Sequence, residues 1–295
     1  MKIARYLCNN YETYGVLVEE TVVSLPELAK QFDRELPSNV EDFVNEGEPA
    51  LKIAERLIRR ISKNLAGVVS TPLKKVAILA PITKPPKIIC LGVNYRDHAR
   101  ETGAAIPEEP ILFMKPRTAI IGPNEEIAKP TFIKQLDYEG ELAVVIGKKT
   151  KNVPTAEAKN HVFGYTVFND VSAREIQFRD RQWTRGKSFD TFAPTGPCIA
   201  TESQLKNTND IGIRTWVNGE LRQNGTTKNM VFSIEKIVHQ LSRVMTLEPC
   251  DIIATGTPSG VGMAMNPQKW LKNGDVVRIE IEGIGVLENT VKETS

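Results

Sequence analysis

The chain has 295 residues, of which 41% are hydrophobic, 25% charged and 6% aromatic. This composition is typical of a folded globular protein and excludes a disordered or collagen-like chain. With 38 Lys and Arg against 36 Asp and Glu, the formal net charge is only +2. The chain therefore lacks the basic excess of a nucleic-acid-binding protein, and we expect no nucleic-acid partner.

From the sequence we expect neither a membrane-spanning helix nor a secretion signal. No stretch approaches the roughly 18 apolar residues of a membrane-spanning helix, and the first residues lack the apolar segment of a signal peptide. Its four cysteines, Cys8, Cys90, Cys198 and Cys250, lie far apart and form no CxxC pair. This spacing favours free thiols over a zinc or redox motif. We expect a cytoplasmic protein with no membrane partner.

The N-terminal part has its own pattern. Apolar and polar residues alternate over residues 1–25, around Gly15, and predict a small β-hairpin. Apolar residues then recur at helical spacing and predict an amphipathic helix over residues 48–63. The proline-containing stretch at 71–86 continues neither a helix nor a central strand. We therefore predict a small N-terminal α+β domain, residues 1–75, and a larger domain, residues 76–295.

The larger domain is predicted to consist mainly of strands. The strands are expected near residues 87–92, 141–146, 161–168, 213–217, 251–255 and 276–281. Asn218-Gly219 predicts a type I′ hairpin turn. Two helices are expected, at 171–182 and at 233–244, with Ser233 as the N-cap of the second. Because helices do not follow each strand, the pattern excludes a Rossmann fold or a βα barrel and predicts an α+β, mainly β, fold.

A pair of acids lies in the predicted strand at 136–147. Glu139 and Glu141 are two residues apart, so both point to the same side of a strand. Two carboxylates that close repel each other unless a cation lies between them, and a hard divalent cation suits them. Two solvated acids on an exposed strand face give the same pattern. The apolar run that follows takes the strand into a core and favours the metal.

A third acid follows the next apolar strand. Asp170 is either the N-cap of the predicted helix or a third carboxylate at the strand end. Asp170, Arg174 and Gln177 are spaced i, i+4 and i+7, so they share one helix face. An acid, a cation and an amide in line suit a metal with an anionic substrate. A solvated helix stripe has the same sequence pattern.

Of the three histidines, one has an acidic neighbour at helical spacing. His98 and Glu101, at i and i+3, form either a base with its orienting acid or a solvated ion pair. His161 and His239 lie in apolar contexts and are expected to be structural.

Two glycine-containing segments invite a phosphate-binding interpretation. Gly186-Lys187-Ser188 is not a Walker A motif, because Arg181 stands where a glycine is required. The glycine-rich loop 256–262 follows an apolar strand, and either its backbone N–H groups approach a ligand or it forms a tight structural turn.

Taken together, these segments resemble the fumarylacetoacetate hydrolase family over about residues 85–292. The resemblance rests on six motifs in the family's order, at residues 92–98, 113–116, 136–147, 169–174, 186–191 and 256–262. The nearest branch contains bacterial members that hydrolyse acylpyruvates or decarboxylate oxaloacetate. The resemblance implies a mixed β-sandwich roll behind a small N-terminal α+β domain, and a homodimer.

The resemblance also implies site residues. The implied ligands of Mg²⁺ or Mn²⁺ are Glu139, Glu141 and Asp170. The implied catalytic residues are His98 and Glu101, on a segment that orders over the substrate and activates water, and Lys187, which stabilises negative charge. The implied substrate-binding residues are Arg174, Gln177, Gly256 and Thr257. Gly140 replaces a bulkier apolar residue that is usual in the family, and we expect it to loosen the packing without touching the ligands.

The implied activity is divalent-metal-dependent C–C bond cleavage of a small anionic 2,4-dioxo acid, of the acylpyruvate or fumarylpyruvate type, through a metal-stabilised enolate. Oxaloacetate decarboxylation and isomerisation of a 2-hydroxyhepta-2,4-diene-1,7-dioate-type substrate use the same electron sink and are the alternatives. A metal-binding homologue without turnover is an alternative of a different class. The joint presence of His98, Glu101 and Lys187 argues against it.

Overall fold

The structure is a computed structural model that describes residues 1–61, 67, 69–205 and 207–294. Strands make up 37% and helices 28% of the chain. This confirms the predicted α+β, mainly β, class. Within the described residues, every helix is too short or too polar to cross a membrane, and the four cysteines are free thiols.

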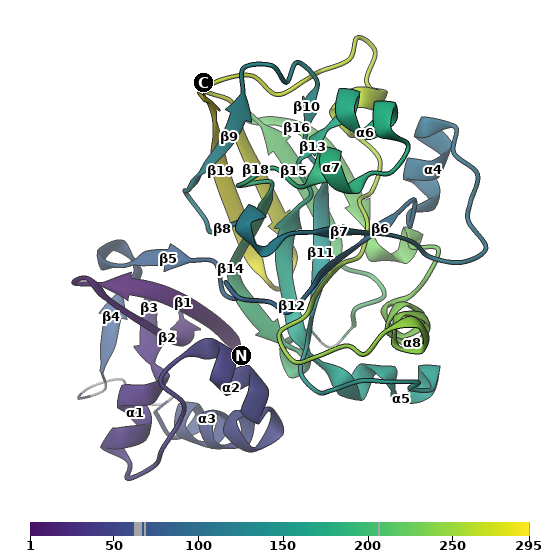
Figure 1. Cartoon of the computed structure of the whole chain (residues 1–295). Helices are drawn as coiled ribbons and strands as arrows, with labels where there is room; N and C mark the ends of the chain where they lie inside the picture. The colour runs from purple at the N-terminus through teal and green to yellow at the C-terminus, as the bar shows by residue number, and fades with distance from the viewer. Residues whose placement is uncertain (62–66, 68, 206, 295) are drawn as a thin grey trace.

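The N-terminal elements form a small module of a curved meander and three helices (Figure 1). Its elements are β1 (Lys2–Cys8), β2 (Tyr11–Val18), β3 (Thr21–Ser24), α1 (Leu25–Gln31), α2 (Val40–Glu46), α3 (Glu48–Ile61), β4 (Ser70–Pro72) and β5 (Ala77–Leu79). The predicted hairpin turns at Asn9 and Asn10, whereas Gly15 lies within β2, where a Cβ would come 2.1 Å from the carbonyl oxygen of Val23. The predicted helix at 48–63 is confirmed as α3, and its last two residues lie outside the described ones.

The meander continues into the main sheet of the body. The sheet runs β4-β3-β2-β1-β14-β12-β11-β17-β6-β7, with β5 paired to β1 and β8 to β14. The strands of the body in this sheet are β6 (Ile88–Gly92), β7 (Ile111–Lys115), β8 (Ile120–Ile121), β11 (Gly140–Ile146), β12 (Val162–Asn169), β14 (Ala193–Thr201) and β17 (Ile252–Ala254). Since β1 pairs with β14 across the predicted boundary, the division after residue 75 stays a prediction.

A second sheet packs against the first and completes the sandwich. Its order is β16-β15-β18-β19-β9, with β9 (Glu126–Pro130), β15 (Gly212–Val217), β16 (Glu220–Thr226), β18 (Val276–Ile281) and β19 (Gly285–Thr294). The strand predicted near 276–281 is confirmed as β18, in which Val277, Ile279 and Ile281 are buried and Arg278 is exposed. The predicted turn at Asn218-Gly219 joins β15 to β16, and both residues have positive φ.

Gly140 packs directly against β15 and β16 of the second sheet, and the expectation of loosened packing there is wrong. A Cβ on Gly140 would lie 2.3 Å from Thr215 Oγ1 and 3.1 Å from Gln223 Oε1. The second sheet therefore already fills the space that a larger residue would need.

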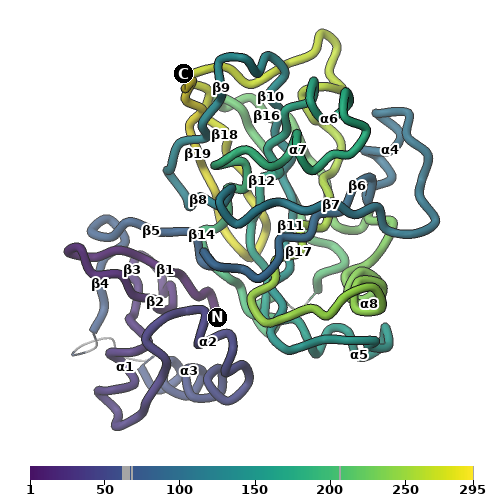
Figure 2. Tube along the Cα trace, in the orientation of Figure 1, coloured from purple at the N-terminus to yellow at the C-terminus, as the bar shows by residue number. Residues whose placement is uncertain are grey.

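The remaining helices surround the sandwich. They are α4 (Arg96–Thr102), α5 (Thr155–Ala158), α6 (Arg174–Asp180), α7 (Thr184–Lys187) and α8 (Ile234–Val244). Ser233 caps α8 as predicted, accepting from the N–H of Lys236. The helix predicted at 171–182 is shorter, because Ser172–Ala173 form β13, which pairs with β10 (Leu136–Asp137). The tube in Figure 2 shows α4, α6 and α7 on the same side of the body.

Candidate metal centre

Glu139, Glu141 and Asp170 meet at the end of the β11–β12 pair. Gly140 is paired with Asn169 in the antiparallel register, which places Glu139 opposite Asp170, and the N–H of Asp170 donates to the carbonyl of Glu139 at 2.9 Å. One carboxylate oxygen from each acid lies within 4.8 Å of the others, and all three residues are buried. Asp170 is not an N-cap, because α6 begins at Arg174 with Ala173 in that position.

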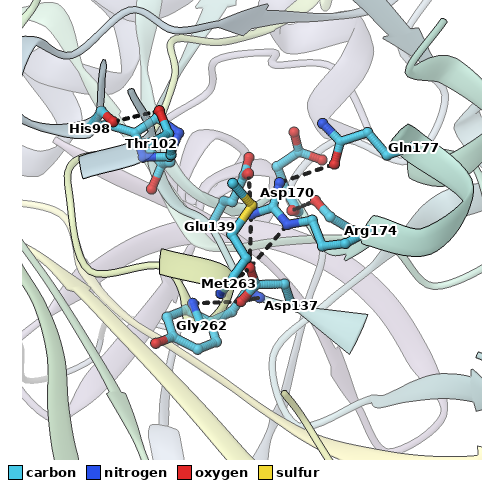
Figure 3. Close-up of polar contacts among 12 residues, drawn as sticks. His98, Thr102, Asp137, Glu139, Asp170, Arg174, Gln177, Gly262 and Met263 are labelled. Atoms are coloured by element: carbon cyan, nitrogen blue, oxygen red, sulfur yellow. Dashed lines mark hydrogen bonds and ion pairs between the residues drawn. The ribbon is translucent and has the colours of Figure 1, made fainter. Parts of the chain in front are cut away.

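Two cations bridge this acid cluster. Lys187 Nζ lies 2.8 Å from both Glu139 Oε2 and Asp170 Oδ2. The Arg174 guanidinium lies 2.7 Å from Glu139 Oε1 and 2.9 Å from Asp137 Oδ2. Figure 3 shows Arg174 between Asp137 on one side and Gln177 on the other. Arg174 and Gln177 share a helix face as predicted, while Asp170 precedes the helix.

A third cation, Lys115, is fixed mainly by backbone. Its Nζ lies 2.7 Å from Asp170 Oδ1 and donates to the carbonyls of Lys187, Phe192 and Val171 at 2.6, 2.8 and 3.1 Å. The cluster therefore contains three buried cations and four buried carboxylates, those of Asp137, Glu139, Glu141 and Asp170.

Within the part of the chain that the structure describes, Glu141 is the acid of this cluster without a cation in direct contact. Its Oε2 accepts from the N–H of Gly256 at 2.8 Å, but its Oε1 is buried and has no hydrogen-bond partner among the described residues. A buried carboxylate oxygen without a partner carries a large desolvation cost. Three converging carboxylates, one of them with an unpaired oxygen, fit a hard divalent cation such as Mg²⁺ or Mn²⁺.

The pKa shifts agree with this charge balance. Burial, together with the Asp170 and Glu139 carboxylates, raises the pKa of Glu141 well above its usual value. Burial acts in the same direction on Glu139, but Lys187 and Arg174 outweigh it and lower the pKa of that acid. Burial alone would lower the pKa of Lys187, yet Asp170 and Glu139 raise it. A cation beside Glu141 would supply the charge that this acid lacks.

The His98–Glu101 pair forms on α4 as the i, i+3 spacing predicts. His98 Nδ1 lies 2.8 Å from Glu101 Oε1, and the other oxygen, Oε2, accepts from the N–H of Gly260 at 2.9 Å. A carboxylate against Nδ1 favours the tautomer with the proton on that nitrogen, which leaves Nε2 as the proton acceptor.

A cavity of about 250 Å³ lies beside the cluster. Its polar lining includes His98, Thr102, Glu139, Arg174, Gln177, Lys187 and Thr257, and its apolar lining includes Leu91, Val93, Phe113, Phe178, Trp183 and Met263. A larger hollow of about 620 Å³ lies between α3 and β12, but its charged side chains are all at least partly exposed. Buried charge therefore marks the smaller cavity as the site.

Gly256 and Thr257, the two loop residues predicted to bind substrate, already form hydrogen bonds within the protein. The Thr257 hydroxyl donates to the carbonyl of Gly140 and accepts from Gln223, and the N–H of Gly256 donates to Glu141. The substrate-binding roles of Arg174, Gln177, Gly256 and Thr257 stay predictions.

Sequence reasoning missed Asp137 and Lys115 as members of this centre. Asp137 accepts from Arg174 and from two N–H groups of the glycine-rich loop, those of Gly262 and Met263. Lys115 and Asp137 lie within the motifs at 113–116 and 136–147. Each is a charged residue next to apolar ones, and this pattern could have indicated a buried charge that needs a partner.

Comparisons with known proteins show the family of the chain. The fumarylacetoacetate hydrolase C-terminal family model matches residues 87–292, so the chain belongs to the fumarylacetoacetate hydrolase family. The human mitochondrial oxaloacetate tautomerase FAHD2A is 42% identical over 262 residues, 88% of this chain and 82% of that protein.

Two solved structures extend the comparison over the whole chain. The 5-carboxymethyl-2-hydroxymuconate delta-isomerase of Mycobacterium smegmatis is 36% identical with a TM-score of 0.78. The maleylpyruvate hydrolase of Sphingobium sp. SYK-6, solved with a manganese(II) ion and pyruvate, is 30% identical with a TM-score of 0.79. Both comparisons cover 100% of each chain. The chemistry of these relatives is that of a hydrolase, an isomerase or an oxaloacetate tautomerase.

Proposed function

We propose that this chain is a divalent-metal-dependent enzyme that interconverts the keto and enol forms of a small 2-oxo acid, with oxaloacetate as the substrate. The observation that carries the proposal is His98, held by Glu101 on the wall of a cavity that Glu139 and Lys187 also line. The relative named as an oxaloacetate tautomerase, 42% identical, supports the choice of substrate.

The proposed role of His98 is proton transfer. In the enol-to-keto direction, Nε2 accepts the proton of the enol hydroxyl, and the resulting imidazolium donates a proton to C3 of the substrate. Glu101 stabilises the imidazolium through Nδ1–H, as an orienting carboxylate does. No water molecule enters the reaction, which suits a small cavity with several apolar walls.

The acid cluster and its cations handle the negative charge. A divalent cation held by Glu139, Glu141 and Asp170 would act as a Lewis acid toward the oxygens of a 2-oxo acid. Lys187 contacts Glu139 and Asp170 and also lines the cavity, and we propose that its ammonium stabilises negative charge on the substrate oxygens. Phe113, whose ring centroid lies 5.0 Å from Lys187 Nζ, keeps water away from that ammonium.

Acylpyruvate hydrolysis is the second candidate, since the same histidine can accept a proton from an attacking water molecule. The maleylpyruvate hydrolase at 30% identity favours it. Oxaloacetate decarboxylation is the third, because it forms the same enolate with loss of CO₂.

The test offers oxaloacetate and an acylpyruvate in parallel, with Mn²⁺. The expected result is that the absorbance of the oxaloacetate enol falls faster with the enzyme and that no CO₂ is released. This result identifies a tautomerase. Release of pyruvate and a carboxylic acid from the acylpyruvate alone would favour the hydrolase, and release of CO₂ above the metal-only rate would favour the decarboxylase. EDTA should abolish activity and Mn²⁺ or Mg²⁺ should restore it.

Variants locate the activity at this site. We expect His98→Ala and Glu139→Ala to lower kcat by roughly 100-fold or more, whereas Glu157→Ala, at an exposed position on α5, should leave it unchanged. Full activity in both site variants would refute the proposed site.

We also propose that the protein is a homodimer with no nucleic-acid or membrane partner, as the family resemblance implies. Sedimentation velocity at micromolar concentration checks this, and a species of 32.8 kDa would contradict it.

A further inference from the structure

Backbone N–H groups of the glycine-rich loop, residues 256–263, donate to acids of the protein itself. These contacts are Gly256 N–H to Glu141 (2.8 Å), Gly260 N–H to Glu101 (2.9 Å), Gly262 N–H to Asp137 (2.8 Å) and Met263 N–H to Asp137 (3.1 Å). The acids come from β11, α4 and β10. One loop therefore holds a proposed metal ligand, the partner of Arg174 and the partner of His98.

The loop approaches so closely because glycine occupies its contact points. Gly260 has a φ of +107°, and a Cβ there would lie 2.0 Å from the carbonyl oxygen of Arg222. At Gly262, which Figure 3 shows beside Asp137, a Cβ would lie 2.6 Å from Asp137 Oδ1. Because these positions are glycines, the backbone N–H groups of the loop come close enough to hydrogen-bond carboxylates, as the N–H groups of a backbone nest bind an anion.

Gly260 is held from both sides. Its N–H donates to Glu101 Oε2, and its carbonyl accepts from the hydroxyl of Tyr138 at 2.9 Å. Glu101 uses its other oxygen for His98 Nδ1. A continuous line of hydrogen bonds therefore runs from Tyr138 through Gly260 and Glu101 to His98.

Tyr138 is anchored well enough to serve as the fixed end of this line. The residue is fully buried and immediately precedes Glu139 in the chain. It is absent from the cavity lining within the described residues, so it acts through its neighbours and not on a substrate.

We propose that Tyr138 is a positioning residue for the reaction. By holding the Gly260 backbone it fixes the Glu101 carboxylate, and thereby the orientation of the His98 ring toward the cavity. This inference rests on the proposed function, since it takes the His98–Glu101 pair as the group that transfers the proton.

The test compares Tyr138→Phe with a matched control, Tyr14→Phe. Tyr14 is also fully buried, and its hydroxyl donates to a backbone carbonyl, that of Pro37, at 2.8 Å in the N-terminal module. Each variant loses one partly buried hydrogen bond from a tyrosine hydroxyl to a backbone carbonyl. We expect Tyr138→Phe to lower kcat by roughly fivefold to tenfold, the worth of one such bond, with KM and Mn²⁺ affinity unchanged. Tyr14→Phe should leave all three unchanged.

A double-mutant cycle shows whether Tyr138 acts through Glu101. Glu101→Gln already removes the carboxylate that orients His98. Adding Tyr138→Phe to this variant should therefore change kcat less than twofold. An undiminished effect in the Glu101→Gln background, or an unchanged kcat in Tyr138→Phe alone, would overturn the proposal.

Amide hydrogen exchange separates this proposal from the proposed function. Exchange in α4 and in residues 256–263 should be faster in Tyr138→Phe than in the wild type, and unchanged in these segments in Tyr14→Phe. If the wild type turned over no 2-oxo acid, the proposed function would fail. The exchange measurement would still show whether Tyr138 holds Gly260, Glu101 and α4 in place. Equal exchange in α4 of all three proteins would overturn the proposal on Tyr138.

Discussion

Two buried lysines contact Asp170, and they are held in different ways. Lys115 also donates to three backbone carbonyls, so its ammonium is fixed by the fold. Among the described residues, the hydrogen-bond acceptors of the Lys187 ammonium are the carboxylates of Glu139 and Asp170. A metal ion that took over these carboxylates would replace both carboxylate partners of Lys187, whereas Lys115 would keep its three backbone carbonyls.

This difference predicts that Mn²⁺ changes the stability of variants of the two lysines differently. Removing one partner of a buried ion pair costs about 3–5 kcal/mol, so Lys115→Met and Lys187→Met should both lower the free energy of unfolding of the metal-free protein. Mn²⁺ should restore Lys187→Met toward the wild type but leave Lys115→Met destabilised. Thermal unfolding with EDTA or with saturating Mn²⁺ measures this, and equal recovery of the two variants would contradict the assignment.

His161, the last residue of the short 3-10 helix Lys159–His161 that precedes β12, makes the free energy of unfolding depend on pH. The Thr150 hydroxyl donates to the Lys148 carbonyl at 2.6 Å, so His161 Nδ1–H donates to Thr150 at 2.9 Å. Burial and the nearby Lys148 charge lower the pKa of His161 below its usual value of 6.5. The unfolded chain therefore binds this proton more readily than the folded one.

The sign of the effect follows from that difference. Above pH 6.5 the ionisation of His161 does not change the free energy of unfolding. As the pH falls from 6.5 toward the lower pKa of the folded state, it lowers the free energy of unfolding. Denaturant unfolding at a series of pH values should show a smaller loss of stability on acidification for His161→Gln, which keeps a donor for Thr150. Parallel pH curves for variant and wild type would be the contrary result.

At the scale of elements, Gly140 controls how closely β11 packs on the second sheet. Since its missing Cβ leaves room for Thr215, Gly140→Ala should destabilise the protein by about 1–3 kcal/mol through overpacking. Thr215→Ala removes the clashing hydroxyl, which has no hydrogen-bond partner among the described residues, and should rescue most of this loss in the double variant. Gly212→Ala is the matched control, because a Cβ there makes only an ordinary 3.5 Å contact. Chemical denaturation of the wild type, the three single variants and the double variant checks the rescue, and additive losses in the double variant would contradict it.

The local part of the candidate site could be predicted from sequence. The His98–Glu101 pair depends only on helical spacing, and Glu139 with Glu141 only on strand alternation. Contacts between distant segments could not be predicted, because sheet register decides them. The Gly260–Glu101 bond joins residues 159 positions apart.

The same limit explains the errors in element boundaries. Residues 172–173 read as the start of a helix, but pairing with β10 makes them a strand. Gly15 resembles a turn residue in sequence, yet it is needed inside β2 because β3 passes too close for a side chain. In both places a tertiary contact outweighs local preference.

At the scale of the molecule, the N-terminal module shares one hydrophobic core with the body. That core joins Ile3, Tyr14 and Phe43 to residues of β6, β11, β12 and β17. The Phe43 ring lies 5.3 Å from Tyr14 and 6.1 Å from Phe163, which is in the body. The shared core and the β1–β14 pairing predict that module and body unfold together.

Phe43→Ala tests this cooperativity. The lost packing should cost about 3–5 kcal/mol and lower the unfolding midpoint of the whole chain. Fluorescence of Trp183, Trp216 and Trp270 reports the body, because these are the three tryptophans of the chain, and hydrogen exchange in α3 reports the module. Both midpoints should fall together, while Phe132→Ala, at a side chain 65% exposed, should move neither. If α3 opened first and the tryptophan midpoint stayed in place, the module and the body would be independent folding units, because the shared core would then contribute nothing to the stability of the body.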